Sequence, residues 1–299
     1  MSNPLVFDRH LLRARRRRAE ALGPATFLVD RVANELADRL STVLRRFPCA
    51  VDLGTPTDAV RRALAGLDAI GTVIRVGTVA HNRNGQCGLS VVADEEALPF
   101  RDASLDLVVS GLALQFVNDL PGTLAQIRRA LRPDGLFLAA LVGGDTLTEL
   151  RQSFAAAEAE VEGGASPRVA PFADLGAVGV LLQRAGFALP VTDIDRIVVR
   201  HASPFGLMDD LRRMAATNAL IERRRIPLRR ATLQRMAEIY RARFADPDGR
   251  IRATFEIVWL SGWAPHASQQ RPLAPGSAER RLADALGVEE ISAGDTAKP

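Results

Sequence analysis

Short apolar runs alternate with amphipathic stretches between residues 49 and 144. The runs are nearly continuous and rich in β-branched residues, which is typical of parallel strands that helices cover on both faces. They predict strands at 49–54, 72–79, 89–95, 105–111 and 136–144. Because amphipathic stretches separate these strands, the pattern predicts an α/β fold with a mostly parallel, doubly wound sheet.

The clearest helix of this region is predicted over 119–131. Leu124, Ile127 and Leu131 form one apolar stripe, and the sequence RPDG after the stripe ends the helix. Asp119 is a residue type preferred at helix starts. Farther along, the pattern predicts helices at 145–162 and 174–185 and strands at 194–201 and 254–264. The predicted sheet therefore has seven strands.

Two further amphipathic stretches lie between the last two predicted strands, around 209–220 and 228–244. They predict a helical insertion that caps the edge of the sheet. The expected organisation is a helical arm at 1–47, a sheet domain at 48–202 and 251–271, the insertion at 203–250 and a tail at 272–299. The tail is rich in proline, glycine and alanine, and we expect it to be partly disordered.

The composition is that of a globular protein. Of the 299 residues, 47% are hydrophobic and 25% are charged, which excludes disordered and fibrous classes. The longest apolar run, 136–142, is far shorter than the roughly 18 residues of a membrane helix. The N-terminal charges do not precede an apolar core, so no secretory signal is predicted. Cys49 and Cys87 have no zinc-ligand or disulfide pattern, which favours a reducing cytoplasm.

Arginine supplies almost all of the positive charge, because Lys298 is the single lysine and the other 38 of the 39 basic residues are arginines. Two clusters are candidates for contact with an acidic protein, nucleic acid or anionic lipid, or are solvated helix faces. They comprise Arg13 with 15–18, and 223–225 with Arg229 and Arg230. Aromatic residues make up only 5% of the chain, so the stacking surfaces that bind single-stranded nucleic acid are not expected. The sequence leaves open whether the protein makes a peripheral contact with the inner face of a membrane.

The segment AVDLGTPTDAVRRAL at 50–64 is an apolar strand that passes through a tight turn into a helix. Doubly wound folds bind ligands at such turns, at the carboxyl ends of the strands. Three more phrases follow at suitable distances: VVADEEALPF at 91–100, SLDLVVSGLALQFVNDLP at 104–121 and LRPDGLFLAAL at 131–141. Together these phrases resemble the class I S-adenosylmethionine (SAM)-dependent methyltransferases. The resemblance implies a Rossmann-like sheet and SAM as the cofactor.

Phrases near both ends narrow the resemblance. FDRHLLRARRRRA, GGDTLTELRQSF and GWAPHASQQRPLAPGSA look like the family of the mitochondrial respiratory complex I assembly factor in this superfamily. That family implies a protein substrate, an arginine on an iron–sulfur subunit of NADH dehydrogenase. The mitochondrial member is regarded as hydroxylating this arginine, whereas bacterial relatives are described as methyltransferases.

The resemblance also implies which positions contact the cofactor. Asp94 and Glu95 match the place where the superfamily holds the adenine amino group, and Gln115 matches a position at the methyl end. The family's first loop has the form DLGCGxG, and its matching residues here are Asp52, Gly54 and Thr55. At the end of the second strand, Gly77 stands where methyltransferases carry an acid for the ribose hydroxyls.

This chain departs from the family in the first loop, which reads Thr55-Pro56-Thr57-Asp58 after Gly54. Two glycines are absent, and Pro56 removes a backbone N–H donor. Asp58 adds a negative charge where the cofactor's carboxylate is expected. Two functions follow from the sequence: an enzyme that modifies a protein with SAM, and a cofactor-free assembly chaperone on an eroded enzyme fold.

Catalytic candidates are fewer. Asp145 follows the fifth predicted strand, where it could orient a guanidinium through bidentate hydrogen bonds or simply cap a helix. His266 lies in a family phrase. With His10, His81 and His201 it shows none of the close pairing with a carboxylate that is typical of non-haem iron sites, so no metal site is predicted.

Overall fold

The computed structural model describes residues 5–79, 88–172, 174–270, 277 and 281–289. The chain forms two compact units, Met1–Pro265 and His266–Pro299. In the second unit the described residues contain the short helix α9 (Leu282–Leu286). The first unit contains the sheet and the candidate site.

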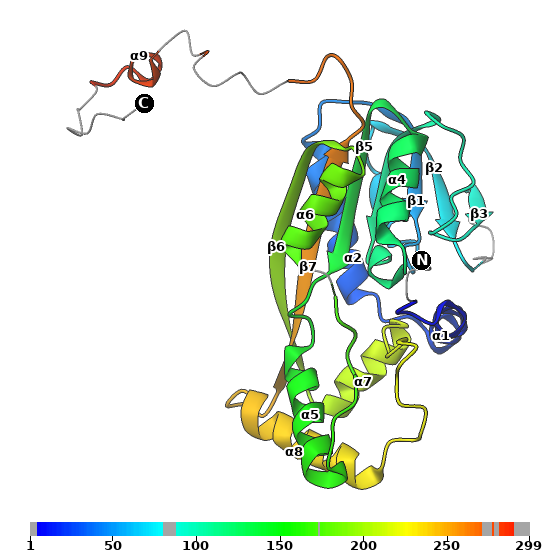
Figure 1. Ribbon diagram of the computed structural model, residues 1–299, viewed down its shortest axis with the longest axis vertical. Helices are drawn as coiled ribbons and strands as arrows, with labels where there is room; N and C mark the ends of the chain where they lie inside the picture. The colour runs from blue at the N-terminus through cyan, green and yellow to red at the C-terminus, as the bar shows by residue number, and fades with distance from the viewer. Residues whose placement is uncertain (1–4, 80–87, 173, 271–276, 278–280, 290–299) are drawn as a thin grey trace. The chain divides into compact units, whose positions relative to one another are not determined.

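A seven-stranded sheet forms the centre of the first unit, in the order β3-β2-β1-β4-β5-β7-β6 (Figure 1). The strands β1 to β5 run parallel, and β7 is antiparallel to both β5 and β6. Their bounds are β1 (Phe47–Leu53), β2 (Ile70–Gly77), β3 (Ser90–Val92), β4 (Leu105–Gly111), β5 (Leu131–Val142), β6 (Ala188–His201) and β7 (Ile251–Trp263). The predicted α/β fold and the seven-stranded, mostly parallel sheet are confirmed.

The sheet is covered on both faces because neighbouring residues of each buried strand point to opposite sides. In β1, Ala50 belongs to the core on the side of α2 and α3, whereas Val51 belongs to the core under α4 and α6. The helices are α1 (Arg9–Leu22), α2 (Phe27–Ser41), α3 (Ala59–Leu64), α4 (Leu120–Ala130), α5 (Thr148–Glu162), α6 (Leu175–Arg184), α7 (Pro204–Arg213) and α8 (Arg230–Phe244). A 3₁₀ turn, η1 (Leu114–Phe116), follows β4.

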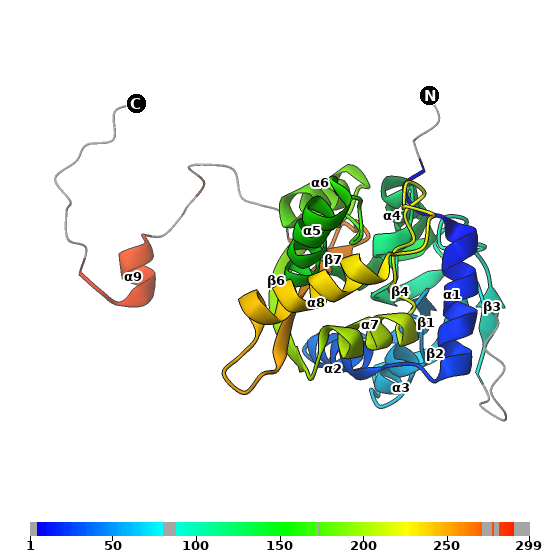
Figure 2. The same cartoon turned by 90° about the horizontal axis from the view of Figure 1, so that it is seen from below.

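The insertion between β6 and β7 differs from its prediction in place and in extent. Its first helix, α7, covers 204–213 rather than 209–220, because Ser203 caps it by accepting a hydrogen bond from the Gly206 N–H. Leu207 and Leu211 of α7 join the core beside α2. α7 and α1 lie across the end of the unit that Figure 2 faces, and the role of the insertion as a cap stays a prediction.

The domain boundaries at 47, 203 and 250 stay predictions, and most of the predicted tail lies outside the described residues. β6 starts at Ala188, earlier than the predicted 194. Its first residues alternate between half-buried and exposed, so they lack a continuous apolar run. Among the described residues, we find no helix with the length and apolar character needed to cross a membrane.

Candidate functional site

A cavity of about 400 Å³ lies at the carboxyl ends of the parallel strands. Gly54 follows β1, Gly77 ends β2, Leu112 follows β4 and Val142 ends β5, and all four line it. Across the sheet, successive strands of the chain are added on one side up to β3 and on the other side from β4, so the strand order changes direction between β1 and β4. Doubly wound folds bind ligands beside such a change of direction. The arm and the insertion line the cavity as well, through residues of α1, α2 and α7.

The turn after β1 keeps one feature of a cofactor loop. Gly54 has a φ of +73°, a backbone conformation that residues with a side chain rarely adopt. A Cβ on Gly54 would lie 2.9 Å from both the Ala113 Cβ and the Glu95 Oε1. The Thr55 hydroxyl accepts a hydrogen bond from the Gly111 N–H at 3.0 Å, which ties the turn to β4. The start of the loop is therefore tightly packed.

The rest of this loop is held by an arginine from β2. The buried Arg75 guanidinium lies 2.9 Å from the Asp58 carboxylate and donates a hydrogen bond to the Thr55 carbonyl oxygen at 3.1 Å. Burial lowers the pKa of Arg75, although Asp52 and Asp58 favour its charged form. Asp58 also pairs with Arg61 at 3.3 Å. The negative charge that the sequence places in the loop is thus neutralised inside the protein.

Asp52 lies at the end of β1 with no exposed surface. Neither of its carboxyl oxygens has a hydrogen-bond partner among the described residues. Burial raises the pKa of this carboxyl to about 7, against the opposing charge of Arg75. Asp52 is not among the residues that line the cavity in the described part of the chain.

Gly77 is bounded by open space. A Cβ built on it would meet no atom within 4 Å, and Gly77 lines the cavity. The position that the superfamily gives to a ribose-binding acid therefore has room for a side chain but carries none.

The two predicted adenine-binding carboxylates are paired with arginines of α1. Arg9 contacts both Asp94, at 2.6 Å, and Glu95, and Arg13 contacts Asp94 at 2.9 Å. Arg16 lies 2.8 Å from Glu95. Burial opposes ionisation of Glu95, but Arg16 and Arg9 outweigh it and lower the pKa of this carboxyl. Burial likewise opposes ionisation of Asp94. The hydrogen bond from the Glu96 N–H and the contacts with Arg9 and Arg13 outweigh it and lower the pKa of this carboxyl.

Gln115, in η1, lies on the cavity wall, and its place at the methyl end of a cofactor stays a prediction. Its Nε2 donates to the Leu112 carbonyl oxygen at 2.8 Å. Its Oε1 is buried and has no partner among the described residues. Gln115 therefore offers one unused acceptor at the cavity.

The predicted catalytic residues are not part of this cavity wall. The Asp145 side chain is 56% exposed and paired with Arg196, which also contacts Glu256 at 3.3 Å. His266 belongs to the second unit, where its Nδ1 lies 2.7 Å from the Ser268 hydroxyl.

The remaining histidines are placed separately. His201 is buried and lies 3.4 Å from Asp210, and His81 lies outside the described residues. Within the described ranges, no group of three or more His, Cys, Asp or Glu side chains is arranged to hold a metal ion. No metal is assigned to the site.

Sequence reasoning missed the arginines that contact the predicted cofactor positions. Arg75 interrupts the apolar run VIRVG, and a charge inside such a strand indicates a buried ion pair. Arg9, Arg13 and Arg16 share one face of a helix by their spacing, but no local pattern shows which acids that face meets. The apolar wall that α2 and α7 supply was also missed, because it depends on contacts between distant segments.

Comparisons with known proteins agree with this architecture. A family model described as a methyltransferase domain matches residues 51–139. The mitochondrial arginine-hydroxylase NDUFAF5 of Homo sapiens is 40% identical over 282 residues, which cover 91% of this chain and 81% of that protein. Its relative from Danio rerio is 37% identical over 296 residues, with 96% and 91% covered.

A malonyl-[acyl-carrier protein] O-methyltransferase of Halorhodospira halophila is also similar, with 35% identity over 281 residues and 90% and 91% of the two chains covered. Among solved structures, a putative methyltransferase of Bacillus halodurans matches with a TM-score of 0.51 and 15% identity, over 78% of this chain and 99% of that one. The last likeness shows the fold alone. The chain therefore belongs to the class I methyltransferase superfamily, within the family of the NDUFAF5 arginine-hydroxylases.

Proposed function

We propose that this chain acts on a protein partner during assembly of respiratory NADH dehydrogenase (complex I), and that it does so without SAM. The observation that carries the second part is the Arg75 contact with Asp58 and Thr55. This contact fixes the loop whose backbone, in the superfamily, approaches the cofactor, and it places a carboxylate with its arginine where that loop has a glycine. The fold then serves as a scaffold that positions the arm and the insertion for the partner.

The residues present do not fit SAM. Pro56 and Asp58 replace loop glycines, so a donor is lost and a carboxylate is added. Gly77 offers no oxygen to the ribose hydroxyls. Asp94 and Glu95 already accept hydrogen bonds from arginines of α1, so an adenine amino group would compete with charged donors. We therefore derive no methyl transfer for this chain.

A second candidate function is enzymatic: the chain would be a SAM-dependent transferase that modifies a protein. It is favoured by the cavity of about 400 Å³ at the expected place, by the retained φ of Gly54 and by the open space at Gly77. In that case Gln115 would face the methyl end, and Asp145 and His266 stay predicted catalytic residues.

The partner we propose is the iron–sulfur subunit of NADH dehydrogenase, at the cytoplasmic face of the respiratory membrane. Relatives named arginine-hydroxylase support a protein substrate that bears an arginine. Three of the six arginines of α1, Arg9, Arg13 and Arg16, are engaged with the chain's own acids, so the helix does not offer the continuous positive surface that nucleic acid requires. No nucleic acid is proposed as a partner.

The experiment is deletion of the gene in the organism that encodes it, followed by assays of NADH dehydrogenase activity in membranes. We expect activity to fall and the wild-type gene to restore it. The tagged chain should co-purify with the iron–sulfur subunit. Mass spectrometry should find no methyl group on that subunit that depends on the gene. Unchanged membrane activity would contradict the assembly role, and a gene-dependent methyl group would favour the second candidate.

A further inference from the structure

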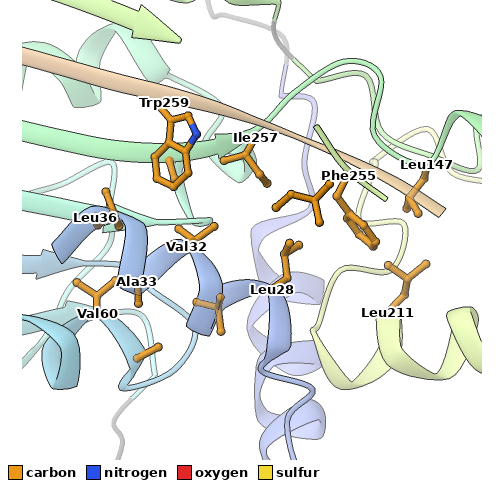
Figure 3. Packing of buried hydrophobic residues seen from close by; sticks show 14 of the residues in the cluster. Leu28, Val32, Ala33, Leu36, Val60, Leu147, Leu211, Phe255, Ile257 and Trp259 are labelled. Atoms are coloured by element: carbon orange, nitrogen blue, oxygen red, sulfur yellow. The ribbon is translucent and has the colours of Figure 1, made fainter. Parts of the chain in front are cut away.

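One wall of the cavity is apolar and is built from four distant segments. Leu28 of α2, Leu147 before α5, Leu211 of α7 and Phe255 of β7 all line it, and each is at most 6% exposed. Figure 3 shows these side chains gathered at the place where the four segments meet. Apolar ligand surface buried against such a wall stabilises a complex roughly in proportion to its area. This wall suits an apolar body.

The cavity also has a cationic side. Arg213, the last residue of α7, lines it and donates its Nε–H to the Gly23 carbonyl oxygen at 2.7 Å. No carboxylate lies within ion-pair distance of Arg213 among the described residues, whereas Arg16 and Arg75 of the same cavity pair with Glu95 and Asp58. The positive charge of Arg213 is therefore available to a ligand.

The start of α2 adds to this positive potential. Residues 24–26 and the first turn of the helix line the same cavity, and the Thr26 side chain makes no capping hydrogen bond. The first N–H groups of a helix carry partial positive charge. Gly23, to which Arg213 donates, lies three residues before Thr26, so the guanidinium and the helix start lie in one region of the wall.

The backbone around the cavity is strained. Leu112, Leu147 and Ala215 have φ values of +54°, +55° and +57°, and all three line it. They are half of the six non-glycine residues with positive φ in the described part of the chain. Such conformations are costly for residues with a side chain, and they concentrate at functional sites. The fold maintains the shape of this cavity against that cost, which indicates that the shape is used.

We propose that the cavity binds an amphipathic organic anion, with its apolar body against Leu147 and Phe255 and its anionic group at Arg213. A volume of about 400 Å³ lies within the range of small-molecule sites, roughly 300–1,000 Å³. The proposal rests on the proposed function in one respect: the anion, and not SAM, is the resident ligand of the cavity.

The test uses two fluorescent probes with the same aromatic body and the full-length chain. 8-Anilinonaphthalene-1-sulfonate carries a sulfonate, and N-phenyl-1-naphthylamine is its uncharged counterpart. We expect saturable binding of both. Arg213→Gln should weaken the sulfonate probe roughly tenfold, because one hydrogen bond to a charged group is lost, and should leave the neutral probe unchanged.

Two variants complete the design. Arg212→Gln removes the neighbouring exposed arginine, which does not line the cavity, and should change neither affinity. Ala216→Leu fills the cavity and should weaken both probes. Circular dichroism verifies that each variant is folded. Decanoate should displace the sulfonate probe, and decylamine should not.

Absence of saturable binding to the folded wild type overturns the proposal. Equal effects of Arg213→Gln and Arg212→Gln on the sulfonate probe overturn it too, because the anionic group would then lie elsewhere. If SAM displaces the probes while the Arg213 effect remains, the cofactor-free function fails and the anion is not the resident ligand, but the assignment of the anionic group to Arg213 stands. The two failures are therefore distinguishable.

Discussion

The attachment of α1 to the sheet predicts how the protein responds to loss of a single arginine. The Glu95 side chain has no exposed surface, and those of Arg9 and Arg16 are each 11% exposed. Removing one partner of a buried pair costs about 3–5 kcal/mol, because a charge is left buried without compensation. In Arg9→Met, Glu95 keeps Arg16, so we expect a loss at the lower end, about 3 kcal/mol in the free energy of unfolding.

Urea denaturation followed by circular dichroism measures this loss. A thermal scan should show a fall in Tm of roughly 6–12 °C, from about 2–4 °C per kcal/mol for a chain of this size. Arg17→Met is the matched control, because Arg17 lies exposed on the same helix, and it should stay within about 0.5 kcal/mol of the wild type. Adding Glu95→Gln to Arg9→Met should recover part of the loss.

The pH dependence follows from the lowered pKa of Glu95. Its pairing stabilises the fold above the carboxyl's ordinary pKa of 4.5, and this stabilisation is lost as the pH falls through the lower folded value. The difference between wild type and Arg9→Met should therefore shrink in acid. An Arg9→Met protein as stable as Arg17→Met at neutral pH would refute the buried ion-pair account of α1.

Three further predictions concern buried groups. Burial raises the pKa of Asp52 to about 7 from 3.8, so the protonated carboxyl favours the folded state at low pH, and this contribution is lost as the pH rises through about 7. Asp52→Asn should therefore be more stable than the wild type in urea titrations at about pH 8. A less stable variant would contradict the burial of an ionisable group. Gly54→Ala should lower the free energy of unfolding by on the order of 1–3 kcal/mol, and Gly77→Ala should leave it almost unchanged. The reason is that a Cβ on Gly54 meets Glu95, whereas one on Gly77 meets open space. Equal losses would contradict the geometry of the loop. Burial raises the pKa of Tyr240, the single tyrosine, so tyrosinate absorbance in an alkaline titration should appear only as the chain unfolds, and its appearance in the folded protein would be inconsistent with this packing.

The strands of the sheet could be predicted because they bury both faces and so consist of continuous apolar runs. The runs at 49–54 and 105–111 coincide closely with β1 and β4. The run at 89–95 yields only the three residues of β3, because Asp94 and Glu95 turn toward α1 instead of extending the strand. Local pattern identifies an element, and distant ion pairs decide where it ends.

The site could be predicted only in part, because resemblance points to positions and not to what covers them. Gly54, Thr55, Gly77 and Gln115 do line the cavity. Asp145 does not, because Arg196 from β6 holds it on the surface, and no spacing in the sequence brings these two residues together.

The central claim, that this methyltransferase fold works without SAM, is tested most directly by calorimetric titration of the full chain with SAM and S-adenosylhomocysteine. The comparison is a variant with Thr55→Cys, Pro56→Gly, Asp58→Gly and Gly77→Asp. It also needs Arg75→Gln, because removal of Asp58 would leave the buried guanidinium unpaired.

We predict no binding heat from the wild type and measurable binding by the repaired variant. Wild-type binding at micromolar strength would contradict the claim and establish that the Arg75 contact with Asp58 coexists with the cofactor.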